Sequence, residues 1–185
     1  MAEPTGPVMT VTLSQTPVLE TERLMLRAID PQDLEPAIAF LSSDRAGYVG
    51  GGANKDQGHC WRIVASLIGH WVLRGTGPFT LMEKSSGKPL GSVGPFYPQG
   101  RPERELSWTI WSPEAEGSGF AFEAVMAIRE HVYHDLGWET AVSYIDPSNT
   151  RSIALARRLG GVLDPDAPRE DANDLVFRHP KPGDV

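Results

Sequence analysis

The sequence predicts an α/β fold in which helices flank a mixed sheet. Strand-like alternation and helical periodicity follow one another in the order β, α, α, β, β, β, α, β, α, β. Two apolar runs on either side of SSGKPL predict an antiparallel hairpin. The run ELSWTIW leads through a glycine turn to a long helix and a further strand, which predicts a βαβ crossover with parallel strands.

The first half of the chain begins with a predicted strand over residues 23–28. Asp30 is then a predicted N-cap with Pro31 at the first helical position, and this helix extends to about Leu41. Residues 42–58 contain five glycines among polar residues, which predicts a long surface loop. Apolar residues at helical spacing predict the next helix over residues 59–74, with Gly75 at its end.

The second half continues with the hairpin, whose turn contains Gly87, and with the strand that begins at Glu105. A single apolar stripe predicts the main helix from about Phe120 to Leu136, with Gly137 after it. A strand over residues 141–145, a helix over 150–159 and a last strand near 175–178 complete the order. No internal repeat is visible.

Length and composition indicate one domain, because 185 residues bury a core without disulfides or a metal. Residues 1–17 are rich in Pro, Thr and Ser without periodicity, so we expect a mobile tail followed by a single domain over 18–185. The lone Cys60 forms no intramolecular disulfide, and no Cys/His spacing indicates a metal site. His131 and His134 lack a third ligand at matching spacing, and we interpret both as solvated.

Charge and hydropathy exclude several classes of protein. A net charge of −7 argues against binding to nucleic acid or acidic membranes, and it suits a cationic substrate such as an amine. No signal peptide and no run of about 18 apolar residues is present, so we expect a cytoplasmic protein. The sequence does not fix the oligomeric state, and a homodimer is one state that it allows.

The segment around Gly117 and Gly119 has the pattern of a phosphate cradle. Glycines without side chains precede a helix whose first N–H groups are free, with the positive end of the helix dipole behind them. The third glycine of the dinucleotide fingerprint and the GxxxxGK[ST] motif are both missing. A flexible turn before a helix is the alternative reading of this segment.

Taken in order, several motifs over residues 18–178 resemble the GNAT superfamily of N-acyltransferases, in the branch that acetylates N-terminal amines of ribosomal proteins. The resemblance implies the GNAT fold, with a mostly antiparallel sheet and a βαβ core that binds the cosubstrate acetyl-CoA. It rests on the opening TERLMLRAIDPQDLEPAIAFL and on Glu105, Trp108, Gly117, Gly119, Ala121, Glu123, Ala124, Pro147, Asn149 and Ser152.

The resemblance also implies which residues bind the cofactor. Backbone groups of Ile110 and Trp111 would pair with the pantetheine arm on a strand that splays from its parallel neighbour. Backbone amides of Gly117, Ser118, Gly119, Phe120 and Ala121 would surround the diphosphate. Asn149 would bind the pantetheine arm or cap the following helix, and Arg151 would meet the 3′-phosphate. Glu114 and Glu116 depart from the family pattern, because carboxylates beside a diphosphate oppose binding.

Two residues are catalytic candidates by the same resemblance. Glu105 would take the proton from the attacking ammonium, although a strand glutamate is often simply solvated. Ser152 would reach the departing sulfur, although it also fits an ordinary first-turn serine. The tyrosine that many family members carry one turn further on is Ala156 here, which excludes a phenol acid from this helix.

The resemblance therefore predicts acetyl transfer from acetyl-CoA to a primary amine by direct attack, the acceptor being a protein N-terminus or a small amine. The glycine-rich segment and the hairpin would line the acceptor side, with Tyr48, Trp61 and Tyr97 as candidates for that wall. A non-catalytic acyl-CoA-binding module and a nucleotide-binding domain unrelated to CoA are the two alternatives left open.

Overall fold

The computed structural model describes residues 13 and 15–184, so residues 1–12 and 14 of the expected mobile tail lie outside the described part. One sheet runs in the order β1-β2-β3-β4-β5-β6-β8-β7. Only β5 and β6 pair in parallel, and every other neighbouring pair is antiparallel. The strands are β1 Leu19–Glu20, β2 Leu24–Ala28, β3 Phe79–Glu83, β4 Pro89–Phe96, β5 Glu105–Ile110, β6 Val142–Ile145, β7 Val162–Leu163 and β8 Leu175–Arg178.

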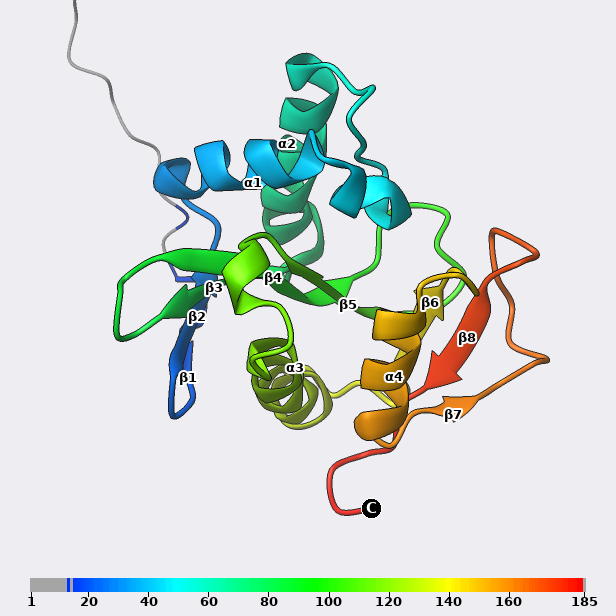
Figure 1. The fold of residues 1–185 in the computed structure, drawn as a ribbon. Helices are drawn as coiled ribbons and strands as arrows, with labels where there is room; N and C mark the ends of the chain where they lie inside the picture. Colours follow the sequence, from blue (N-terminus) through cyan, green and yellow to red (C-terminus); the bar gives the residue numbers. More distant parts are fainter. Residues whose placement is uncertain (1–12, 14, 185) are drawn as a thin grey trace, which may run out of the picture.

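Four α-helices cover the two faces of this sheet. In Figure 1, α1 and α2 lie above the sheet, and α3 and α4 lie below it. None of the helices in the described part is long and apolar enough to cross a membrane. The helices are α1 Leu34–Leu41, α2 Gln57–Arg74, α3 Phe120–Glu130 and α4 Thr150–Arg158, with shorter helical segments η1 Pro31–Asp33, η2 Asp44–Val49, η3 Pro113–Ala115 and η4 His131–Asp135.

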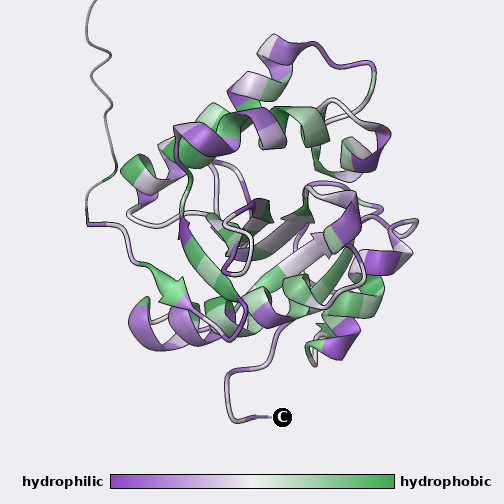
Figure 2. Cartoon of the chain, turned by 60° about the vertical axis from the view of Figure 1, so that its left-hand side comes forward, coloured by the Kyte–Doolittle hydropathy of each residue, from purple (hydrophilic) through white to green (hydrophobic). Residues whose placement is uncertain are grey.

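Four apolar clusters occur in the described residues, and the two largest hold α1, α2 and α3 in place. The larger one packs the inner side of α3, through Ala124, Val125 and Ile128, against β2 to β5. The smaller one joins α1, η2 and α2 and includes the buried Cys60. Hydrophobic residues accordingly concentrate in the strands, and hydrophilic residues alternate with them along the helices (Figure 2).

The structure corrects the predicted order in three places. β1 and β7 have only two residues each, which is too short for a periodicity signal. The predicted loop over 42–58 contains η2, a 3-10 helix that ends at Gly50 with φ +82°. The main helix changes to a π-helix at His131.

The interpretation of His131 as solvated was wrong. Its side chain is 6% exposed, its ring stacks edge-on against Phe79, and its Nδ1 lies 2.7 Å from Asp135 Oδ2. His131 lies seven residues after the buried Ala124, about 20° from it around an ideal helix, so the apolar stripe of α3 itself places this residue towards the sheet. His134 is exposed, as expected.

Candidate active site

The parallel strands β5 and β6 separate almost as soon as they meet. They pair at one position only, Glu105 opposite Val142. The next carbonyl of β5, that of Leu106, accepts the Ser143 hydroxyl at 2.6 Å instead of a backbone N–H of β6. The β5 edge beyond this point is released from its neighbour, which leaves a wedge between two strands of the sheet.

A buried serine and histidine hold the apex of this wedge. Ser143 Oγ lies 2.8 Å from His179 Nε2, and burial lowers the pKa of His179 to about 4. Because the single hydroxyl proton is donated to Leu106, the neutral imidazole must donate from Nε2 to Ser143. This histidine therefore does not activate the serine as a nucleophile, and the pair serves to satisfy the carbonyl where strand pairing stops.

Replacement of Ser143 by alanine is expected to lower the free energy of unfolding by about 1–3 kcal/mol, because it leaves the buried Leu106 carbonyl and His179 Nε2 without a partner. Chemical denaturation measures this loss. Ser66→Ala is the matched control, since that exposed hydroxyl bonds only to a carbonyl of its own helix. Equal stability of the two variants would contradict the role assigned to Ser143.

The released edge presents backbone groups of alternate residues. The carbonyls of Leu106 and Ile110 face away from β4, and strand alternation directs the N–H and C=O of Trp108 the same way. Trp111 differs from the expectation, because its N–H is bonded to the Leu90 carbonyl at 2.7 Å and its carbonyl accepts a hydrogen bond from Arg45 at 2.7 Å. Its side chain is buried in the smaller apolar cluster.

The glycine turn before α3 forms an open cradle. Gly117 and Gly119 have φ values of +74° and +82°, and Gly119 is the N-cap of α3 without a side-chain cap. A Cβ added at Gly117 would meet no atom within 4 Å, and one at Gly119 would meet only Arg23 at 3.5 Å. The N–H groups of the first turn of α3 are thus left for an external anion such as a diphosphate.

The end of β5, from Trp108 to Ile110, and the cradle share one groove, which encloses about 930 Å³. Two of the predicted cofactor residues are not on its wall: Ser118, and Trp111, which lines a neighbouring cavity instead. The predicted cofactor residues on its wall are Ile110, Gly117, Gly119, Phe120, Ala121, Asn149 and Arg151.

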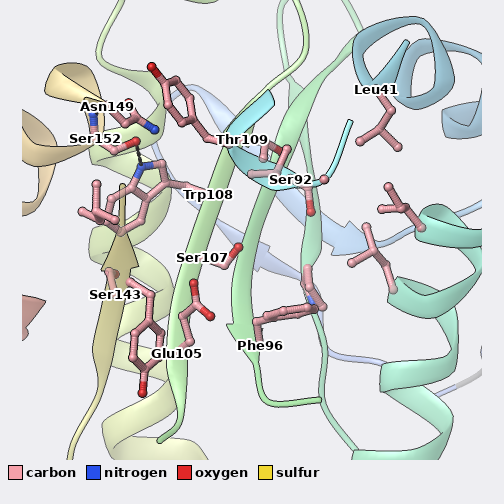
Figure 3. Close-up of a pocket in the computed structure, with 18 of the residues that line it drawn as sticks. Leu41, Ser92, Phe96, Glu105, Ser107, Trp108, Thr109, Ser143, Asn149 and Ser152 are labelled. Carbon is pink, nitrogen blue, oxygen red and sulfur yellow. Dashed lines mark hydrogen bonds between the residues drawn. The ribbon is translucent and has the colours of Figure 1, made fainter. Parts of the chain in front are cut away.

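The N-terminus of α4 forms the other side of the groove. Asn149 is its N-cap, and the side-chain oxygen of Asn149 accepts the N–H of Ser152 at 3.2 Å. The Ser152 hydroxyl in turn accepts the indole N–H of Trp108 at 3.2 Å, as Figure 3 shows. Because this hydroxyl acts as an acceptor towards Trp108, its own proton remains free to be donated to a ligand.

Glu105 lies in a second cavity of about 490 Å³, which adjoins the groove at Trp108 and Ser152. Figure 3 shows its carboxylate beside Ser107 in the space next to β5. The residue is 7% exposed, and burial raises the pKa of its carboxyl to about 7. Arg101 Nη2, 2.9 Å from Oε2, opposes this shift. Near neutral pH such a carboxylate both accepts and releases a proton readily.

The second cavity carries an excess of negative charge. Its charged lining consists of Arg101 and four acids. The pKa of Asp174 is raised, mainly by burial and next by the negative charge of Asp171, as expected where acids lie close together. The four acids are Glu105, Asp146, Asp171 and Asp174.

The two cavities meet at a small set of shared residues. Trp108, Thr109, Asn149 and Ser152 line both of them, and so do Phe40, Tyr48 and Val49 from α1 and η2. Trp61 and Tyr97, the other residues suggested for the acceptor wall, line neither cavity.

Sequence reasoning missed Arg45, Arg101 and the acids of the β7–β8 connection. Arg45 lies in η2, and its guanidinium reaches the end of β5 from about 65 residues earlier in the chain. A contact over that separation leaves no local signal. Arg101 had one weak signal, its position four residues before Glu105.

The comparison with known families decides what this arrangement is. Residues 23–162 match the family described as "Acetyltransferase (GNAT) domain". The chain belongs to the GNAT acetyltransferases. The predicted family, fold and enzymatic class are thereby confirmed, and acetyl-CoA is the acetyl donor that GNAT acetyltransferases use.

Solved structures agree with this assignment. An acetyltransferase from Agrobacterium tumefaciens is 36% identical, with a TM-score of 0.83 over 89% of this chain and 95% of that one. A putative ribosomal-protein-serine acetyltransferase from Vibrio cholerae is 20% identical, with a TM-score of 0.66 over 88% and 97%. A spermidine N-acetyltransferase from Vibrio cholerae, solved with CoA and spermine, is 16% identical, with a TM-score of 0.64 over 85% and 94%. The last two likenesses concern the fold of this GNAT protein.

Proposed function

We propose that this GNAT acetyltransferase transfers the acetyl group of acetyl-CoA to a primary amine, either a protein N-terminus or a small amine, by direct attack. The observation that carries the proposal is the junction at Trp108 and Ser152, where the groove with the open cradle meets the acidic cavity. A thiol carrier in the groove and an amine in the cavity would meet at this junction.

The groove suits the cofactor in two parts. The N–H groups that follow Gly119 are the ligands for the diphosphate, because the helix start is uncapped and a side chain there would fill the space. The edge of β5 at Trp108 and Ile110, which pairs with no strand, is the partner for the amide groups of the pantetheine arm, with Asn149 across the groove. In this structure Arg45 occupies the Ile110 carbonyl.

The acidic cavity suits a cationic acceptor. Four carboxylates face one guanidinium in its lining, so an ammonium group entering from water is attracted. Tyr144 and Phe96 flank Arg101 at 4.9 and 5.6 Å between ring centroids and the guanidinium, which keeps this cation at the wall beside Glu105.

Proton transfer then follows from the two catalytic candidates. Acetyl-CoA supplies an activated thioester, so its chemistry needs a neutral amine and a donor for the departing sulfur. The Glu105 carboxylate takes the proton of the ammonium, and the amine nitrogen forms the new C–N bond as the C–S bond breaks. The Ser152 hydroxyl, held by Trp108, donates its proton to the departing sulfur and regains one from the nitrogen of the new amide, so that the products are the amide and CoA as its thiol.

Mass spectrometry of acetyl-CoA incubations with a panel of peptides and polyamines tests this function. The expected result is an acceptor heavier by one acetyl group, with one CoA released per product. Tight CoA binding without any acetylated amine across the panel would instead support a role in binding acyl-CoA. A rise in melting temperature with ATP or NAD but not with CoA would contradict the cofactor assignment.

A further inference from the structure

One departure from the family pattern lies at the mouth of the cradle. Glu116 directly precedes Gly117, where a carboxylate would repel a diphosphate. In the structure this carboxylate is bound by two arginines. Arg45 Nε donates to its Oε1 at 2.9 Å, and Arg151 Nη1 pairs with its Oε2.

Arg45 also binds backbone carbonyls at the end of the unpaired edge of β5. Its guanidinium donates to the carbonyls of Ile110 and Trp111 at 2.8 and 2.7 Å, at the end of the strand that the pantetheine arm would follow. Three residues later, η2 touches the far side of the groove, where Tyr48 Oη lies 3.3 Å from Ser148 Oγ. η2 therefore spans the groove from β5 to the start of α4.

The ion pairs that fix this arrangement are weak enough to exchange. The side chains of Arg45 and Glu116 are each 28% exposed, and that of Arg151 is 81% exposed. Partly exposed pairs of this kind contribute little net stability, because water screens the charges and the long side chains lose freedom when they pair. A diphosphate offers both arginines more charge and bidentate acceptors, so it binds them better than one carboxylate does.

We propose that Arg45 and Arg151 bind the diphosphate of the cofactor, and that Glu116 holds both arginines until the diphosphate replaces it. For Arg151 this replaces the contact with the 3′-phosphate that the family resemblance implied. The inference rests on the proposed function. Exchange frees the Ile110 and Trp111 carbonyls at the moment the phosphate groups arrive. Glu116 then turns to solvent, and the two arginine charges that it neutralised interact with the diphosphate instead.

Titration calorimetry with CoA tests the exchange in the Glu116→Gln variant. Removal of the internal competitor is expected to tighten CoA binding about fivefold or more, which corresponds to about 1 kcal/mol. Glu114→Gln is the matched control, because Glu114 lies two residues earlier, contacts Ser112 at 2.8 Å and touches neither arginine. It is expected to leave the affinity within about twofold.

Arg45→Gln provides the second arm. It is expected to weaken CoA binding about tenfold, and the gain from Glu116→Gln should shrink in the double variant, because the two residues share one interaction. If Glu114→Gln and Glu116→Gln tightened CoA binding equally, the cause would be the loss of one negative charge near the site. That result would overturn the exchange. Unchanged or weaker binding by Glu116→Gln would overturn it as well. Failure of the wild-type protein to bind CoA would instead remove the proposed function.

Discussion

Gly119→Val is expected to abolish measurable CoA binding, with a loss of at least about thirtyfold, because the cradle depends on an empty position beside the start of α3. Gly119 has φ +82°, and the space next to it contains only the Arg23 guanidinium at 3.5 Å. A branched side chain would occupy the place of the diphosphate and turn the first N–H groups of α3 away from it. Calorimetric titration with CoA measures the effect.

The matched control is Gly137→Val. Gly137 also has positive φ, +63°, and open space around its Cβ position, but it lies beyond the other end of α3. Both substitutions therefore impose a similar backbone strain of about 1–3 kcal/mol, visible in thermal unfolding. Only the change at Gly119 is expected to affect the cofactor. A loss of CoA binding that is equal in the two variants would show that the effect is one of folding.

Glu105→Gln is expected to lower kcat/KM for the amine about 10²- to 10⁴-fold, because glutamine does not accept the ammonium proton. In the wild-type protein kcat/KM should rise as pH increases through about 7, where the buried carboxyl ionises. The variant should lose this rise. Rate measurements from pH 5.5 to 8.5 with saturating acetyl-CoA provide both results.

Two controls separate catalysis from structure. Glu170→Gln removes an exposed acid that contacts the same Arg101 at 2.9 Å. It should keep the rise and move its midpoint only slightly to lower pH, because Glu170 is the smallest of the causes that raise the pKa of Glu105. Stability gives an independent readout, since the native carboxyl binds a proton more readily than the unfolded one between pH 4.5 and 7. The unfolding free energy of the wild-type protein relative to Glu105→Gln should therefore rise by about 3 kcal/mol as pH falls from 8 to 4. A flat difference would contradict the raised pKa.

Local patterns predicted the parts of the fold that depend on local physics. Asp30 is an N-cap, and Gly75, Gly119 and Gly137 adopt the positive φ that their positions next to helices suggested. The hairpin and the strand–turn–helix at Gly117 were found for the same reason. Two-residue strands and the π-helical turn at His131 were not, because each depends on packing against a distant element.

The candidate site likewise has one part that local patterns predicted and another that they did not. The cradle is built from residues adjacent in the sequence, so the spacing of its glycines predicted it. Arg45 binds carbonyls about 65 residues further along the chain, and the acids of the second cavity come from β5, from the residue after β6 and from the β7–β8 connection. The raised pKa of Glu105 likewise follows from burial, which a single strand position does not reveal.

Hydrogen–deuterium exchange with and without saturating CoA tests most directly whether this groove holds the cofactor. Slower exchange is predicted in peptides that cover residues 106–112 and 117–124, where a bound ligand would engage the backbone N–H groups, and in the start of α4. Unchanged exchange in these segments, with protection appearing elsewhere under conditions where CoA is bound, would contradict the account.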